Sequence, residues 1–128
     1  MGKTAVFVLS SLQQIDTDKP SPEPKVLVLA HTRELASQIA HEFERFSKHF
    51  TGVKTACFYG GNPFINDKTV LTEQKPTIIV GTPGRIHQHV REKTLNLKEL
   101  SIFVLDECDK LLENLGLKSP LLRFFIIR

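Results

Sequence analysis

Four short runs of largely apolar residues, each followed by a polar or glycine-containing motif, place the strongest constraint on the fold. They are VLVLA (26–30), KTACFY (54–59), TIIV (77–80) and IFVL (102–105). Continuous apolar runs of this length are typical of strands that are buried on both faces of a parallel sheet. The sequence therefore predicts four strands at these positions.

The segments between these runs predict helices. Leu35, Ile39, Phe43 and Phe46 recur at helical spacing and give an amphipathic helix after the first strand, with Thr32 as its N-cap. Further helices are expected at 3–15, within 65–75, at 85–92 and at 110–115, and the proline-containing segment 16–25 is expected to be an exposed loop. Because helices and strands alternate, we predict an α/β domain with a mostly parallel sheet.

The composition is that of one ordinary globular domain. The 128 residues are 41% hydrophobic and 24% charged, and the net charge of +3 permits a polyanionic partner without requiring one. No apolar run approaches the roughly 18 residues that a membrane span needs, so no membrane contact is expected. Cys57 and Cys108 form no paired motif, which favours a reducing compartment.

Polar motifs follow all four predicted strands, at the place where open α/β sheets bind ligands. They are His31-Thr32-Arg33, Gly60-Gly61, Thr82-Pro83-Gly84-Arg85 and Asp106-Glu107. Arg33 and Arg85 suit the phosphates of a nucleic acid backbone, and for Arg33 a salt bridge with Glu34 or Glu42 is the alternative. The glycine pair either lets a sugar-phosphate chain approach backbone N–H groups or simply forms a tight turn.

Two further motifs point to a nucleotide. Gly2-Lys3-Thr4 matches the end of the phosphate-loop pattern G-x-x-x-x-G-K-[ST], whose first glycine would precede residue 1. Lys3 would neutralise the β- and γ-phosphates, and the Thr4 hydroxyl would join a Mg²⁺ shell. Asp106 and Glu107 could hold Mg²⁺ and polarise a water, although alone they could simply solvate a helix start. Together these motifs predict a nucleoside triphosphatase.

In their order along the chain, GKT (2–4), HTRELA (31–36), GG (60–61), TPGR (82–85) and DECD (106–109) resemble the first RecA-like domain of a DEAD-box RNA helicase. Within this family, Cys108 in the DECD motif and His31 in the HTRELA motif make the sequence resemble the DECD subgroup, which comprises the nuclear helicases of spliceosome assembly and mRNA export. The resemblance covers residues 2–115, and the tail 116–128 lacks family character. It implies a truncated P-loop NTPase domain within 1–128 that lacks the strand preceding the phosphate loop.

The resemblance also implies a role for each motif residue. Gly2, Lys3, Thr4, Asp106 and Asp109 would bind ATP, Thr4 and Asp106 would hold Mg²⁺, and Lys3, Asp106 and Glu107 would be catalytic, with Glu107 activating the hydrolytic water. Thr32, Arg33, Gly61, Thr82 and Arg85 would lie along an RNA backbone independently of base sequence. The implied partners are RNA, ATP and proteins of the spliceosome and of mRNA export, and the implied location is the nucleus.

Two further expectations follow from the incomplete pattern. The chain would be part of an ATP-dependent RNA helicase and inactive or nearly so alone; the alternative is a stand-alone RNA- or protein-binding half-module without catalysis. A sheet that lacks a central strand would leave two inner edges unpaired, so we expect the isolated chain to be poorly stable or to oligomerise.

Overall fold

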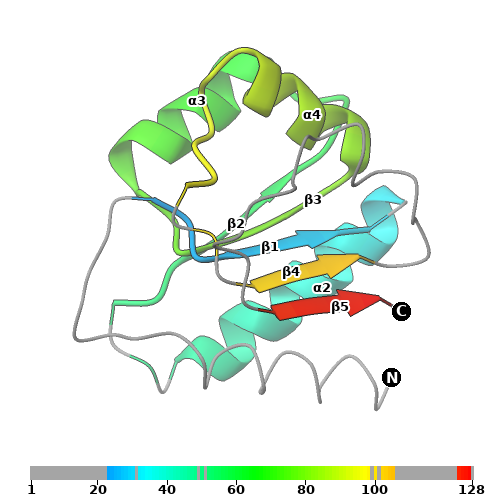
Figure 1. Ribbon diagram of the computed structural model, residues 1–128, viewed down its shortest axis with the longest axis vertical. Helices are drawn as coiled ribbons and strands as arrows, with labels where there is room; N and C mark the ends of the chain where they lie inside the picture. Colours follow the sequence, from blue (N-terminus) through cyan, green and yellow to red (C-terminus); the bar gives the residue numbers. More distant parts are fainter. Residues whose placement is uncertain are drawn as a thin grey trace.

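The computed structural model describes residues 23–30, 32–48, 50, 52–98, 100, 102–105 and 124–127 (Figure 1). The elements are β1 (Val26–Leu29), α2 (Arg33–Ser47), β2 (Thr55–Phe58), α3 (Phe64–Glu73), β3 (Ile78–Gly81), α4 (Pro83–Arg91), β4 (Ile102–Leu105) and β5 (Phe124–Ile127). The four predicted strands and the three helices predicted between them are confirmed. The helices expected at 3–15 and 110–115 lie outside the described residues.

The strands form one sheet in the order β2-β3-β1-β4-β5, and every neighbouring pair is parallel. This confirms the parallel α/β fold. β5 was not expected: it comes from the tail and pairs with β4, with Phe124 opposite Ile102. Since the described strands are hydrogen-bonded without a gap, the prediction of two unpaired inner edges is wrong for them.

Local sequence explains where two of the helices begin. The Thr32 hydroxyl accepts a hydrogen bond from the Leu35 amide at 3.1 Å, which confirms Thr32 as the N-cap of α2. Pro83 occupies the first turn of α4, where a missing backbone N–H costs nothing because that group has no helical partner. α3 begins after Pro63 and has no side-chain cap. Both α2 and α4 begin within four residues of the end of the preceding strand.

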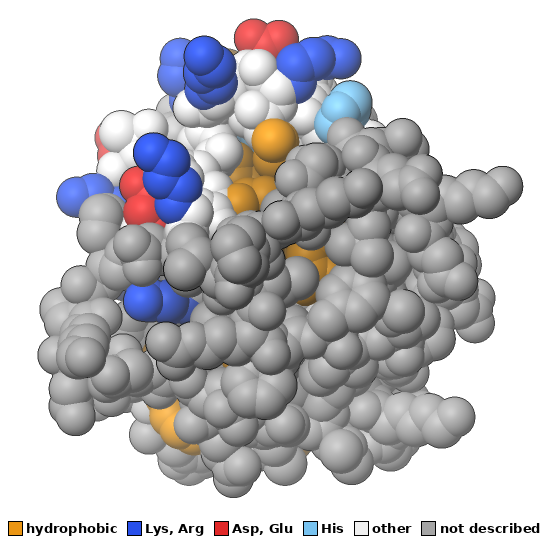
Figure 2. Space-filling view, viewed as in Figure 1, with side chains coloured by type: hydrophobic (Ala, Val, Ile, Leu, Met, Phe, Trp, Pro, Cys, Tyr) orange, Lys and Arg blue, Asp and Glu red, His pale blue; other side chains and the backbone are white. Residues whose placement is uncertain are grey.

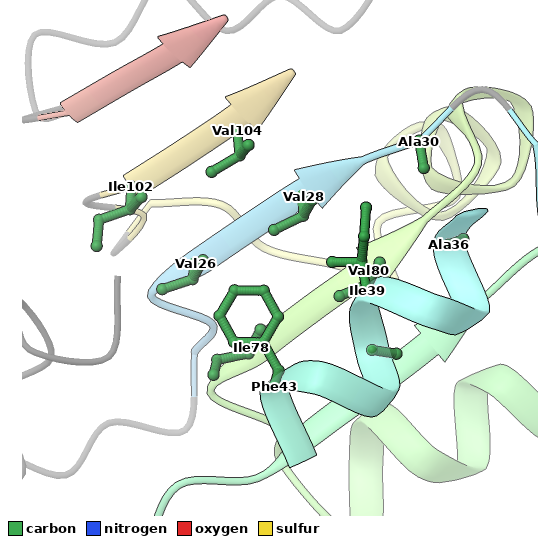
Figure 3. Close-up of a cluster of buried hydrophobic side chains, with 11 residues drawn as sticks. Val26, Val28, Ala30, Ala36, Ile39, Phe43, Ile78, Val80, Ile102 and Val104 are labelled. Atoms are coloured by element: carbon green, nitrogen blue, oxygen red, sulfur yellow. The ribbon is translucent and has the colours of Figure 1, made fainter. Parts of the chain in front are cut away.

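Helices cover the two faces of the sheet (Figure 1). On one face, Phe43, Ile39 and Ala36 of α2 pack over the valine and isoleucine side chains of β1, β3 and β4 (Figure 3). On the other face, Ile86 of α4 packs with Leu27, Leu29, Ile79 and Phe103, and α3 adds the partly buried Val70 and Leu71. Burial on both faces explains why the strands are apolar throughout.

Within the described ranges, no helix is both long enough and apolar enough to cross a bilayer.

Candidate nucleic-acid interface

The carboxyl ends of β1, β2 and β3 lie at one edge of the sheet. Gly81, the last residue of β3, is the register partner of both Leu29 and Phe58, the last residues of β1 and β2. The segments that carry Thr32, Arg33, Gly61, Thr82 and Arg85 therefore leave the sheet at the same level. The structure brings these five sequence-predicted positions to one edge.

Arg33 extends from the start of α2 across the loop that follows β2, the Gly60 loop (residues 59–62). Its Nη1 donates to the Gly60 carbonyl at 3.4 Å, and the guanidinium carbon lies 5.4 Å from the centroid of the Tyr59 ring. Gly61 has a φ of 102°, and a Cβ built on it would lie 2.9 Å from Arg33 Nη1. A glycine at 61 thus permits both the turn and the close approach of the arginine.

The salt bridge offered as an alternative for Arg33 does not form with Glu42. Glu42 instead pairs with Arg45, with an Nη2–Oε2 distance of 2.7 Å. In the part of the chain that the structure describes, the Arg33 guanidinium has no carboxylate within ion-pair distance, and its side chain is exposed. Its positive charge is therefore presented to solvent at the edge of the sheet.

Arg85 is placed differently from Arg33. Its side chain is only 7% exposed, its Nη2 donates to the Asn62 carbonyl, and its Nε lies 3.6 Å from Asp67 Oδ2. The guanidinium carbon also lies 5.8 Å from the centroid of the Phe64 ring. Sequence reasoning treated the two arginines alike, whereas the structure turns Arg85 inward. Both nevertheless contact the Gly60 loop.

Thr32 and Thr82 precede α2 and α4 at this same edge. The Thr82 amide donates to the Phe58 carbonyl at 3.1 Å, and its side chain makes no capping hydrogen bond. The first-turn N–H groups of a helix lack helical partners, and the helix dipole favours anions there. Two helix starts, an exposed arginine and a glycine loop therefore supply the donors and the positive charge that phosphate oxygens need.

A buried polar cluster behind this edge was missed by sequence reasoning. His89 Nε2 lies 2.9 Å from Asp67 Oδ2, and His89 Nδ1 lies 2.7 Å from Thr94 Oγ1. Asp67 is 6% exposed and His89 is fully buried. The one available signal is that His89 stands four positions after Arg85, on the same helical face. Asp67 stands 22 positions before His89 in the sequence, so helical spacing does not indicate that the two residues are in contact.

The residues predicted for the nucleotide site, Gly2, Lys3, Thr4, Asp106, Glu107 and Asp109, lie outside the described residues. β4 ends at Leu105, directly before Asp106 in the chain, and Leu105 is the register partner of Leu29 in β1. The strand that leads into the acidic motif therefore ends at the same edge as the other motifs. Among the described residues, no group of three or more His, Cys, Asp or Glu is placed to hold a metal ion.

Charge on the described surface is mixed. On the face shown in Figure 2, lysine and arginine side chains gather over the region of α3 and α4 and are interspersed with acidic side chains.

Burial, followed by the negative charges of Glu44 and Asp67, raises the pKa of the Cys57 thiol to about 11. Because so high a pKa keeps the thiol protonated at neutral pH, Cys57 is unsuited to act as a nucleophile or metal ligand.

The sequence matches the family model of the DEAD/DEAH box helicases over residues 1–124. It is similar to the Aspergillus fumigatus protein named ATP-dependent RNA helicase sub2, with 53% identity over 124 residues. This match covers 94% of the chain and 27% of the relative. The chain therefore spans little more than a quarter of that relative's length.

Solved structures share the fold. A DEAD box protein from Methanococcus jannaschii matches with a TM-score of 0.79 and 32% identity over 98% of this chain and 36% of that one. A variant of S. cerevisiae Dbp5 bound to RNA and ADP BeF3 matches with a TM-score of 0.77 and 25% identity over 98% of this chain and 33% of that one. The likeness confirms the predicted RecA-like architecture.

Proposed function

Because the chain belongs to the DEAD/DEAH box helicase family, we propose that it is part of an ATP-dependent RNA helicase and that the edge formed by residues 32–33, 59–62 and 82–85 binds the sugar-phosphate backbone of RNA. One observation carries this proposal. The exposed Arg33 lies across Gly60 and Gly61 with no carboxylate partner among the described residues, beside the starts of α2 and α4.

The donors at this edge suit a phosphate backbone better than base edges. Helix-start N–H groups and an arginine contact phosphate oxygens without reading sequence. Binding should therefore be independent of base sequence and sensitive to salt, with a log–log slope of about 0.7 per phosphate contacted on a single strand. Thr32, Arg33, Gly61 and Thr82 would face the backbone directly, and Arg85 would support the Gly60 loop or turn outward to join them.

For the nucleotide, the proposed residues are those of the two motifs outside the described ranges. Gly2, Lys3 and Thr4 would hold the phosphates of ATP, Thr4 and Asp106 would hold Mg²⁺, Glu107 would orient the attacking water, and Asp109 would connect this site to the rest of the domain. Bound ATP–Mg²⁺ would supply the hydrolysable phosphoanhydride. The Dbp5 variant bound to RNA and ADP BeF3 supports a combined nucleotide and RNA function in a protein of this fold.

The cellular role proposed for the whole protein is pre-mRNA splicing and mRNA export in the nucleus, with partner proteins from both processes. Its support is the DECD sequence at 106–109 and the 53% identity to the sub2 relative. A second candidate is an RNA-binding module without catalysis. It is favoured by one observation: the residues proposed for RNA, which lie within 32–85, and those proposed for ATP are separate segments of the sequence.

A binding experiment on the 128-residue chain tests the proposal. Fluorescence anisotropy with a labelled single-stranded RNA would compare the wild-type chain with Arg33→Gln and with Arg45→Gln, an exposed arginine in the last turn of the same helix that pairs with Glu42. We expect Arg33→Gln to weaken the Kd roughly fivefold, about 1 kcal/mol, and Arg45→Gln to change it little. Equal Kd values for the two variants would contradict the proposed edge.

The same titration separates the two candidate functions. The helicase proposal expects ATP–Mg²⁺ to change the RNA Kd of the wild-type chain, because Asp106 directly follows β4 in the sequence and β4 is the neighbour of β1, which leads to Thr32 and Arg33. An RNA Kd that is indifferent to ATP–Mg²⁺ would favour the binding module.

A further inference from the structure

α3 is held to the domain by a buried carboxylate. Asp67 is the one buried residue of this helix, while Ile65 is 62% exposed and Val70 and Leu71 are only partly buried. A buried charge is costly unless it is paired and hydrogen-bonded. The partners of Asp67 therefore decide where α3 and the Gly60 loop before it sit.

The partners of Asp67 come from α4, and the turn that follows α4 supports one of them. Asp67 Oδ2 lies 2.9 Å from His89 Nε2 and 3.6 Å from Arg85 Nε. On the far side of the imidazole, His89 Nδ1 lies 2.7 Å from the Thr94 hydroxyl, which itself donates to the His89 carbonyl at 3.1 Å. Among the described residues, the only fully buried side-chain polar atom without a hydrogen-bond partner is Thr55 Oγ1, so every fully buried polar atom of this cluster has a partner.

Both ring nitrogens of His89 have a polar partner. Nε2 meets Asp67 Oδ2, and Nδ1 meets the Thr94 hydroxyl, which also donates to the His89 carbonyl. The imidazole is therefore held on both sides, and Asp67 contacts both this ring and Arg85.

The His89 ring also contacts both ends of the segment that carries the Gly60 loop. Phe64, the first residue of α3, stacks on the imidazole at 4.4 Å between ring centroids with an interplanar angle of 19°. The ring centroid of Phe58, the last residue of β2, lies 5.2 Å from that of the His89 imidazole. Arg85 Nη2 meanwhile donates to the Asn62 carbonyl within the loop. The loop is therefore tied to α4 before, within and after the glycine pair.

We propose that Asp67, His89 and Thr94 form a positioning network that holds the Gly60 loop and Arg85 in place for RNA, with His89 as its central residue. The inference rests on the proposed RNA-binding function, since the network acts on RNA only through the Gly60 loop and Arg85. His89 orients the Asp67 carboxylate and clamps both ends of the loop. Asp67 in turn keeps Arg85 on the Asn62 carbonyl.

The test compares two substitutions of His89 in the 128-residue chain. His89→Phe keeps a stacking ring and removes both ring nitrogens, whereas His89→Gln keeps an amide that can donate close to the position of Nε2. We expect His89→Phe to weaken the Kd for single-stranded RNA roughly fivefold and His89→Gln to restore it to within about twofold, the scale of one hydrogen bond to a charged partner. His87→Phe, at a partly exposed position of the same helix, is the matched control and should leave the Kd unchanged.

Amide NMR of the free chain supplies a readout that needs no RNA. In His89→Phe the amide signals of residues 60–62 and the Arg85 Nε–H signal should shift, while those of Ala36 and Ile39 in α2 should stay in place. If the wild-type chain binds no RNA, the proposed function fails, and these NMR shifts alone decide the inference. Unchanged loop signals, or equal RNA affinities for His89→Phe and His87→Phe, would overturn it.

A milder variant covers the case in which His89→Phe does not fold. Thr94→Val has nearly the same shape and removes the hydroxyl that contacts His89 Nδ1 and donates to the His89 carbonyl, while it leaves the contact between His89 and Asp67 in place. We expect a Kd weakened roughly twofold to threefold, with smaller shifts of the same loop signals. Loop signals and RNA affinity identical to wild type in a folded Thr94→Val chain would overturn the network.

Discussion

Gly61→Ala is the substitution whose effect the structure specifies most closely. With a φ of 102°, Gly61 occupies backbone space that side chains rarely adopt, and an alanine there is expected to cost about 1–3 kcal/mol. The new Cβ would also lie 2.9 Å from Arg33 Nη1, which is the flexible end of a side chain and can move. The displaced arginine would lose its 3.4 Å hydrogen bond to the Gly60 carbonyl, a loss of about 0.5 kcal/mol.

Urea unfolding followed by circular dichroism measures this cost. A loss of about 2 kcal/mol would lower the urea midpoint by roughly 1–2 M for a chain of this size. Gly60→Ala is the matched control, because a Cβ at Gly60 meets nothing within 4 Å and Gly60 is not among the positive-φ residues. It should leave the midpoint unchanged or raise it slightly, since alanine reduces the entropy of the unfolded chain.

The same two variants test the link between the loop and Arg33. Gly61→Ala should also weaken RNA binding, because Arg33 can no longer lie across the loop. Equal urea midpoints for Gly60→Ala and Gly61→Ala would refute the backbone argument. An RNA Kd that responds to Arg33→Gln and not to Gly61→Ala would refute the claim that Gly61 positions the arginine.

Two other predictions concern the sheet. Gly81→Ala would place a Cβ 2.6 Å from the Phe58 carbonyl oxygen and 2.7 Å from Ile86, so we expect it to destabilise the fold by about 1–3 kcal/mol. Gly84→Ala is the control, because a Cβ at Gly84 meets nothing within 4 Å and should not destabilise the fold. Equal urea midpoints for the two variants would contradict this prediction. Burial raises the pKa of the Cys57 thiol from 9.0 to about 11, so the contribution of the protonated thiol to folding stability is present below pH 9.0 and is lost as the pH rises towards 11. Alkylation of Cys57, followed by mass spectrometry of its peptide, should accelerate roughly tenfold per pH unit through this range. An alkylation rate that levels off near pH 9.0 would contradict the burial of the thiol.

Much of the fold could be predicted because the decisive signals are local. A strand buried on both faces must be apolar throughout, as β1, β3 and β4 are, and α2 has both a capping threonine and an apolar stripe. β5 was missed because four apolar residues near the chain end become a strand only by pairing with β4. The strand order, which places β3 between β2 and β1, likewise depends on long-range pairing.

The candidate site could be predicted in outline, since parallel strands deliver the residues that follow them to one edge. The different surroundings of Arg33 and Arg85 could not be predicted from the sequence. Arg85 is turned inward by Asp67, which lies on α3, a helix with little apolar periodicity to show which side faces the domain. His89 gives no sequence signal beyond its helical spacing from Arg85, because its partners Asp67 and Thr94 are set by tertiary packing.

The central claim is that RNA binds at the carboxyl edge of the sheet, and amide NMR of the isotope-labelled chain titrated with a short single-stranded RNA tests it most directly. We predict that the largest signal changes occur at residues 32–33, 60–62 and 82–85. Lys54 and Thr77, at the opposite ends of β2 and β3, should change little. Changes that are absent, or that are as large at Lys54 and Thr77 as at Arg33 and Gly61, would contradict the account.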